Sequence, residues 1–151
     1  MTANNAPAFA AIMLLTGIGI PILAALNAGL GLRLGHPMAA SVILFGVALL
    51  IAFAGALVTG AAGHIRLSAD IPFQFYLGGL FVAFYVIAVT FIAPRFGVGN
   101  AIFFVLVGQL VSAATIDHFG LFGAMRFPVD AKRLAGIALM VAGVWLARRT
   151  G

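Results

Sequence analysis

The hydrophobic and polar positions of the chain follow one another in long blocks. Apolar runs occupy about residues 9–32, 38–59, 72–93, 100–116 and 131–147, and the breaks between them carry charged residues, proline or glycine. About 20 apolar residues in a helix cross the hydrocarbon core of a bilayer, and about 17 is the low end of that range. The pattern predicts an all-α integral membrane protein with five transmembrane helices in a single domain, residues 1–151. The fifth helix reaches about 17 residues only if Lys132 and Arg133 extend to the interface, because its uninterrupted apolar core begins at Leu134.

The composition excludes a water-soluble fold. Of the 151 residues 64% are hydrophobic, only three are acidic and eight are basic, and the mean hydropathy is +1.23. Such a chain cannot cover a surface with polar groups, so its main solvent is lipid. The basic residues are isolated between apolar runs, which argues against a nucleic-acid partner. The first run lacks a basic segment before it and is too long for a signal peptide, so we expect a retained span.

Nothing in the sequence indicates a metal, a cofactor or an enzyme. There is no cysteine, and His36, His64 and His118 lie near predicted span ends without the spacing of metal ligands. The chain has no Ser/His/Asp constellation, no glycine-rich phosphate loop after a strand and no paired acids within a span. We therefore expect no enzymatic activity and no cofactor.

Gln109 is the first candidate site residue, because it stands mid-span in an otherwise apolar run. A side-chain amide without a partner in hydrocarbon costs roughly 1 to several kcal/mol, so Gln109 should face another helix or a wet cavity. At helical spacing it lies at the edge of a small-residue stripe, where a packed interface would open into a cleft. The stripe consists of Ala101, Gly108, Ser112 and Thr115, and we place Ser112 with Gln109 in the predicted substrate site.

Two further groups of polar or aromatic residues join this prediction. Asn27 is the most polar residue of the first span and either lines a cavity or bonds a neighbouring helix or backbone carbonyls freed by Pro21. In the third span Gln74, Phe81 and Tyr85 share one helix face. Such a stripe serves packing or the interfacial belt in many membrane helices, but the amide and the hydroxyl favour a cavity wall here.

The polar connections carry local predictions. Arg66 and Asp70 are candidates for an exposed ion pair. The run from Pro94 to Gly97 should break a helix, Asn100 should cap the next one, and Asp130 should cap the last. The second span has a ladder of small residues that we interpret as a packing face without chemistry.

Asp117 and His118 form the most conspicuous polar pair, at the end of the fourth span. A carboxylate beside an imidazole at the membrane interface could relay protons. The alternative is a structural role, in which the pair caps the helix and anchors the following loop. No acid lies mid-span, since Asp70, Asp117 and Asp130 all fall at predicted ends.

The loop charges bear on orientation. Five spans put the termini on opposite sides of the membrane, and the Lys and Arg residues can be counted by side. One side carries Arg66, Arg126, Lys132 and Arg133, and the other carries Arg33, Arg95, Arg148 and Arg149. Four against four selects no insertion direction, so both are allowed, and two opposite copies can pair as an inverted homodimer.

Three stretches carry a resemblance to a known family. They are LNAGLGLRLGHPMAASVILFGVALL at 26–50, GGLFVAFYV at 78–86 and above all VGQLVSAATIDHFGLFG at 107–123. In combination they resemble the YdcZ-type inner membrane exporter family, a short-chain branch of the drug/metabolite transporter superfamily, over nearly the whole chain. The resemblance implies a multi-pass protein of the bacterial inner membrane. Full-length members of that superfamily contain two inverted five-helix halves, so one chain resembles half a transporter.

Three functions are compatible with this sequence. The first is a secondary exporter of small polar or amphipathic solutes that works as an antiparallel, dual-topology homodimer in the lipid bilayer. A heterodimer with a related chain of fixed orientation is its variant. The second is a membrane subunit that assembles with another protein without transporting anything, and the third is a flippase for lipids or lipid-linked molecules. The sequence identifies neither the substrate nor the coupling ion.

Overall fold

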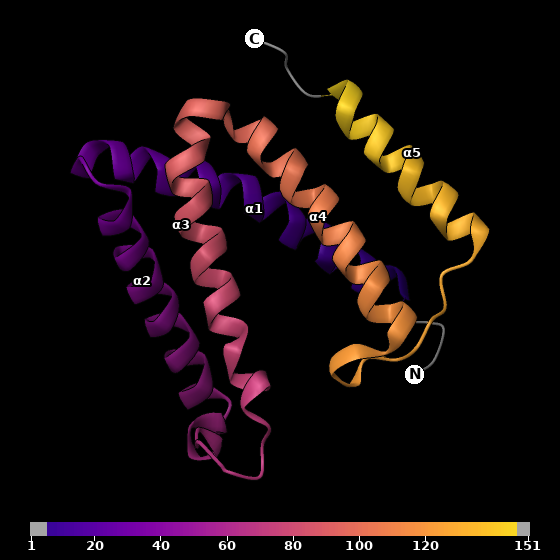
Figure 1. Ribbon diagram of the computed structural model, residues 1–151. Helices are drawn as coiled ribbons and strands as arrows, with labels where there is room; N and C mark the ends of the chain where they lie inside the picture. The colour runs from indigo at the N-terminus through magenta and orange to yellow at the C-terminus, as the bar shows by residue number, and fades with distance from the viewer. Residues whose placement is uncertain (1–5, 148–151) are drawn as a thin grey trace. The chain divides into compact units, whose positions relative to one another are not determined.

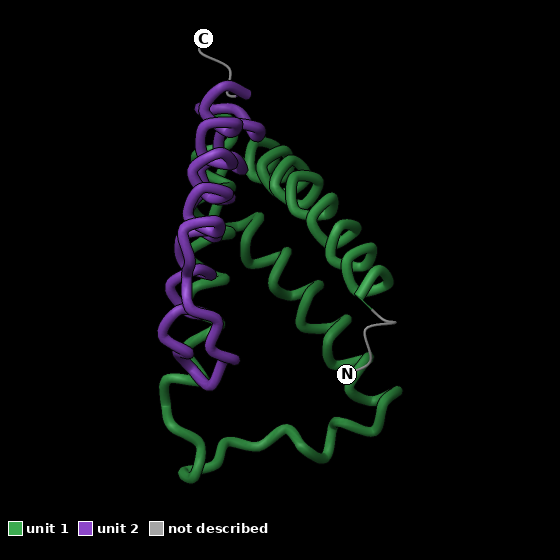
Figure 2. Tube along the Cα trace, turned by 90° about the vertical axis from the view of Figure 1, so that its right-hand side faces the viewer, with its two compact units in different colours: residues 1–95 green, residues 96–151 purple. Residues whose placement is uncertain are grey.

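The computed structural model describes residues 6–147, which form five α-helices, three short 3₁₀ segments and no strand. In chain order the long elements are α1 (Ala6–Leu34), α2 (Pro37–Val58), α3 (Gly78–Phe96), α4 (Val98–Phe119) and α5 (Ala131–Ala147), as Figure 1 shows. The chain divides into two compact units, residues 1–95 and 96–151 (Figure 2). The predicted all-helical class is confirmed.

Unit 1 begins with a tight hairpin of α1 and α2. α1 is helical through Pro21 and ends at Leu34, after which Gly35 adopts a left-handed conformation with φ of 73°. α2 starts at once, because Nδ1 of His36 accepts a hydrogen bond from the Met38 N–H at 3.2 Å and Pro37 suits the first turn. Gly31 allows the close approach, since a Cβ there would lie 3.2 Å from Cα of Pro37.

The third helix of unit 1 packs on α1 through small and branched residues. A 3₁₀ segment, η3 (Phe73–Leu77), leads directly into α3, and together they form an apolar stretch of 24 residues. The buried apolar side chains of the unit are few and small: Ala24, Ala28, Ala40, Val86, Val89 and Ala93. A core of this size leaves most of the helix surface to the lipid or to a partner.

One local prediction for unit 1 is wrong. Asp70 accepts a hydrogen bond from the Ser68 hydroxyl at 3.1 Å, and no ion pair joins it to Arg66 within residues 6–147. The nearby hydroxyl competes with the arginine, as serine does in short loops. The predicted helix break between Pro94 and Gly97 is confirmed, because α3 ends at Phe96 and Gly97 separates it from α4. The Arg95 guanidinium donates to the Phe91 carbonyl, one turn earlier in the same helix, at 2.5 Å.

Unit 2 is a second helical hairpin, made of α4 and α5. Gly97, with φ of 89°, makes the break before α4, and Gly120, with φ of 65°, ends that helix by donating its N–H to the Ile116 carbonyl. Asn100 is not the N-cap that the sequence suggested, because it lies inside the first turn, where its Nδ2 donates to the Phe96 carbonyl at 3.0 Å. Asp130 does cap α5: its Oδ1 accepts from the Arg133 N–H at 2.7 Å.

Four of the five expected spans are long apolar helices. α1, α2, the stretch Phe73–Phe96 and α4 have the length and composition to cross a membrane, and only 6–17% of each apolar window is buried within the chain. α5 does not reach that length, since its 17 residues rise about 26 Å against a hydrocarbon core of about 30 Å. The expected fifth span is thus present as a helix that is short for a crossing.

Candidate solute-binding site

Gln109 lies midway along α4 and points away from α5. Val111, Ala114, Thr115 and His118 face α5, because they line the space between the two helices. At 3.6 residues per turn Gln109 is roughly 180° around the helix from that face. Its side chain is exposed, and its amide has no hydrogen-bond partner among the described residues. At the depth of a bilayer centre this amide requires a partner, and the described part of unit 2 does not supply one.

The residues around Gln109 leave room for a close neighbour. Nothing lies within 4 Å of the point where a Cβ on Gly108 would stand. Ser112 is exposed about one turn further on, whereas the Thr115 hydroxyl is satisfied by the Val111 carbonyl at 2.9 Å. Gln109 and Ser112 therefore lie on the same side of α4.

The predicted stripe in the third span is shorter than expected. Phe81 and Tyr85 lie one turn apart in α3, but Gln74 belongs to η3, and the tighter 3₁₀ period moves it off their common face. Phe81 is 71% exposed. The Tyr85 hydroxyl oxygen is inaccessible yet has no hydrogen-bond partner. A buried hydroxyl without a hydrogen-bond partner costs about 1–3 kcal/mol. The Tyr85 hydroxyl is therefore available to bond a solute or another chain.

Asn27 is tied into the core of unit 1. Its side chain is 4% exposed, and its Nδ2 donates to the Thr90 hydroxyl at 2.6 Å. The Thr90 hydroxyl in turn donates to the Val86 carbonyl, also at 2.6 Å. Asn27 thus makes the helix-to-helix bond that was one of its two predicted roles. The sequence analysis did not single out Thr90. A polar residue within the third apolar run is nevertheless a signal that could have identified it as a helix-to-helix bonding position.

Asp117 and His118 hold the loop after α4. The Asp117 carboxylate forms an ion pair with the Arg133 guanidinium at 2.5 Å, between side chains that are each about one third exposed. Nδ1 of His118 accepts from the Val129 N–H at 3.0 Å, which places the proton of a neutral ring on Nε2. The His118 carbonyl also accepts from Nε of Arg126 at 3.2 Å. These bonds match the structural alternative for the pair.

A cavity of about 400 Å³ opens between α4 and α5. Its walls are apolar apart from Thr115 and His118, and it holds none of the predicted substrate residues. A smaller cavity of about 160 Å³ lies at the end of unit 1 beside Arg95 and Thr90. The described residues contain no group of three or more potential metal ligands.

The predicted site residues fall into two sets. Asn27, Gln74, Phe81 and Tyr85 belong to unit 1, and Gln109 and Ser112 belong to unit 2 together with Asp117 and His118. Among Asp, Glu, Lys, Arg and His, no described residue lies in the middle of a long helix. Any solute that meets these residues at mid-membrane depth meets amides, hydroxyls and aromatic rings.

Comparison with known proteins identifies the family to which this chain belongs. A family model described as "Putative inner membrane exporter, YdcZ" matches residues 8–146, which is most of the chain and includes all of α2, α3 and α4. No curated protein and no solved structure matches the chain. The matched description names an exporter, and four helices have the length and composition to cross the inner membrane several times. The chain belongs to the YdcZ family of inner membrane exporters.

Proposed function

We propose that this chain is one half of a secondary exporter for small polar or amphipathic solutes and that an inverted second copy completes it. The observation that carries the proposal is Gln109: an exposed amide without a partner, midway along a helix of membrane-spanning length. An amide that faces lipid would remain unsatisfied at a cost of several kcal/mol. An amide in the wall of a solute path can instead form hydrogen bonds with the solute or with water.

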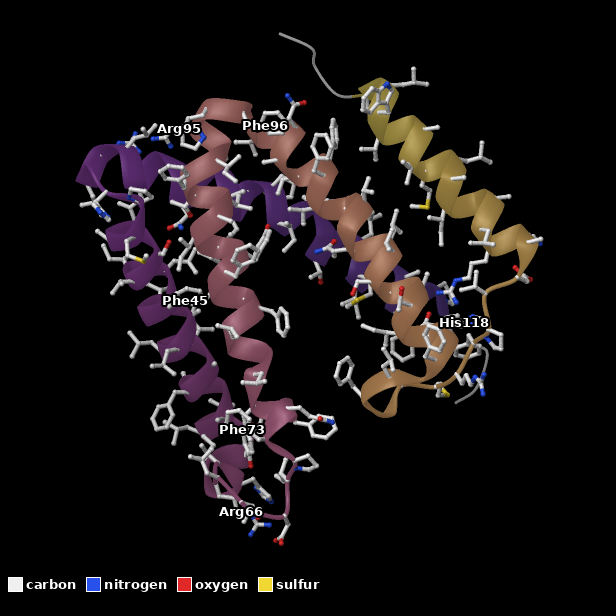
Figure 3. All side chains as sticks on the ribbon, viewed as in Figure 1. Phe45, Arg66, Phe73, Arg95, Phe96 and His118 are labelled. Carbon is white, nitrogen blue, oxygen red and sulfur yellow. The ribbon has the colours of Figure 1, made fainter. Side chains whose placement is uncertain are left out.

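The distribution of charge supports insertion in both directions. Arg66 and Arg95 lie at opposite ends of unit 1 (Figure 3). In unit 2, Arg126 bonds the His118 carbonyl and Arg133 pairs with Asp117, and Lys132 precedes Arg133 in the chain. These three basic residues therefore lie near the end of α4 that holds His118, which Figure 3 labels. Arg148 and Arg149 lie outside the described residues. If α5 crosses the bilayer, with Lys132 and Arg133 reaching to the interface, the count stays at four on each side.

Inverted pairing gives a half-size exporter the symmetry that alternating access requires. Many secondary transporters consist of two repeats related by an axis in the membrane plane, with the substrate site near the bilayer centre. Two parallel copies would give only an axis along the membrane normal. Unit 2 offers Gln109 and Ser112 to the proposed lining, and unit 1 offers Phe81 and Tyr85. Gln74 lies nearer the surface, and Asn27 holds α1 against α3.

The mechanism follows from the absence of charge in this lining. Its amides and hydroxyls can replace water around a polar solute, while Phe81 offers an apolar surface. No described side chain at this depth is a carboxylate, so the solute does not compete with a proton for a buried acid. If Asp117 and His118 relay protons, their hydrogen bonds to Arg133 and Val129 must open during the cycle.

Orientation and flux together test the proposal. A reporter that fluoresces in the cytoplasm and an enzyme active only outside it are each fused to the carboxy terminus, and both should give signal. Cells that carry the chain should tolerate some members of a panel of amphipathic toxicants better than cells that carry Gln109→Leu. A signal from one side only, with no difference across the panel, would overturn the proposal. Scrambling of a fluorescent phosphatidylethanolamine in liposomes would favour the flippase alternative.

A further inference from the structure

We infer that Gln109 of one copy meets Gln109 of the other at the two-fold axis, so that the two amides form a reciprocal pair in the empty transporter. This inference rests on the proposed antiparallel homodimer. It adds that α4 of each copy packs at the two-fold axis and that the partner contributes its own Gln109.

The position of Gln109 along α4 is the first argument. An antiparallel pair has its axis in the membrane plane, and α4 crosses that plane at its middle. Gln109 stands midway between Val98 and Phe119. Two-fold rotation therefore returns Gln109 to its own depth within about one residue, or about 1.5 Å along the helix. Residues nearer the ends of α4 are carried to the opposite end.

The direction of Gln109 is the second argument. α5 covers the opposite face of α4, as the residues that line the space between these two helices show. The Gln109 face has no neighbour within unit 2, and the small, exposed Ser112 about one turn further on lets another backbone approach on that side. A second α4 that packs on this face places its own amide against the first.

The chemistry of the amide is the third argument. A side-chain amide carries a donor and an acceptor, so two related by a two-fold axis can each donate to the other. No other residue type available at this depth of α4 is self-complementary in this way without a charge. The pair would satisfy both amides in hydrocarbon, and a solute with donors and acceptors could take its place during transport.

Cysteine cross-linking tests the inference in a clean background, because the chain has no cysteine. Gln109→Cys alone should form a disulfide-linked dimer in membranes treated with copper phenanthroline. Val111→Cys is the matched control, at nearly the same depth but on the face toward α5, and should stay monomeric. Disulfide formation needs Cα atoms within about 7 Å, which only the Gln109 face would meet.

Cross-linking between two different cysteine variants shows whether the two α4 helices run antiparallel or parallel. Ile102 and Ile116 lie seven residues before and seven after Gln109, almost on its face. In an antiparallel pair the two Ile102 residues are roughly 21 Å apart along the axis, while Ile102 of one copy faces Ile116 of the other. Ile102→Cys and Ile116→Cys should therefore cross-link when the two chains are co-expressed, and neither should cross-link alone.

The outcomes separate the two proposals. Cross-linking of Ile102→Cys with itself would mean parallel helices and would overturn both. If the carboxy-terminal reporters show both orientations but neither Gln109→Cys nor the mixed pair cross-links, the homodimer stands and the pairing through α4 is wrong. As a second measurement, Gln109→Glu and Gln109→Lys should each lose co-purification of differently tagged copies, and mixing the two chains should restore it. Failure of that rescue alongside normal expression also counts against the pair.

Discussion

The bond between Asn27 and Thr90 offers the sharpest test of how unit 1 is held together. Thr90→Val keeps the branched shape of the side chain but removes the oxygen that accepts from Nδ2 of Asn27 at 2.6 Å. Both residues are 3–4% exposed, so water cannot replace the lost partner. We expect the substitution to destabilise the unit and to weaken the packing of α3 on α1.

The magnitude follows from two ranges. Hydrogen bonds between membrane helices contribute about 0.6 kcal/mol on average and up to about 1.7 kcal/mol. A buried donor left without a partner costs about 1–3 kcal/mol. The short distance and the depth of burial place this bond in the upper part of the first range, so we expect Thr90→Val to lower the free energy of unfolding by about 1.5 kcal/mol.

Unfolding in mixed micelles by dodecyl sulfate, followed by circular dichroism at fixed protein concentration, measures this effect. Thr115→Val is the matched control, because the Thr115 hydroxyl bonds only the Val111 carbonyl of its own helix and should change stability by less than about 0.5 kcal/mol. In an Asn27→Leu background Thr90→Val should lose most of its effect. Equal losses for Thr90→Val and Thr115→Val, or no coupling with Asn27, would refute the reasoning.

Three further predictions concern packing, the loop and transport. Gly31→Ala should destabilise unit 1 by about 1–3 kcal/mol in the same assay, because its Cβ would lie 3.2 Å from backbone, whereas Gly46→Ala, with open space, should not. Asp117→Asn, which weakens the pair with Arg133, should expose the segment 120–130 to protease while changing global stability by no more than about 1 kcal/mol; unchanged cleavage would contradict an anchoring role. Gln109→Leu should reduce export more than it reduces expression, and full export in that variant would remove Gln109 from the solute path.

The sequence alone determined the class of the protein and the places where its helices run. Lipid as solvent follows from composition, and helices follow because each backbone polar group in hydrocarbon must be satisfied within its own segment. The Asp130 cap was predictable because a cap depends on residues within one turn. Gln109 was recognisable as a candidate because an amide mid-span is conspicuous against an apolar background.

Only the tertiary structure decided which polar residues are already occupied. The sequence could not distinguish a cavity role for Asn27 from a bond to another helix, because its partner Thr90 lies 63 residues away. The same holds for Asp117, whose cation, Arg133, comes from the next helix. Local rules fix a helix, but a polar side chain in lipid is satisfied by whichever group the fold brings near it.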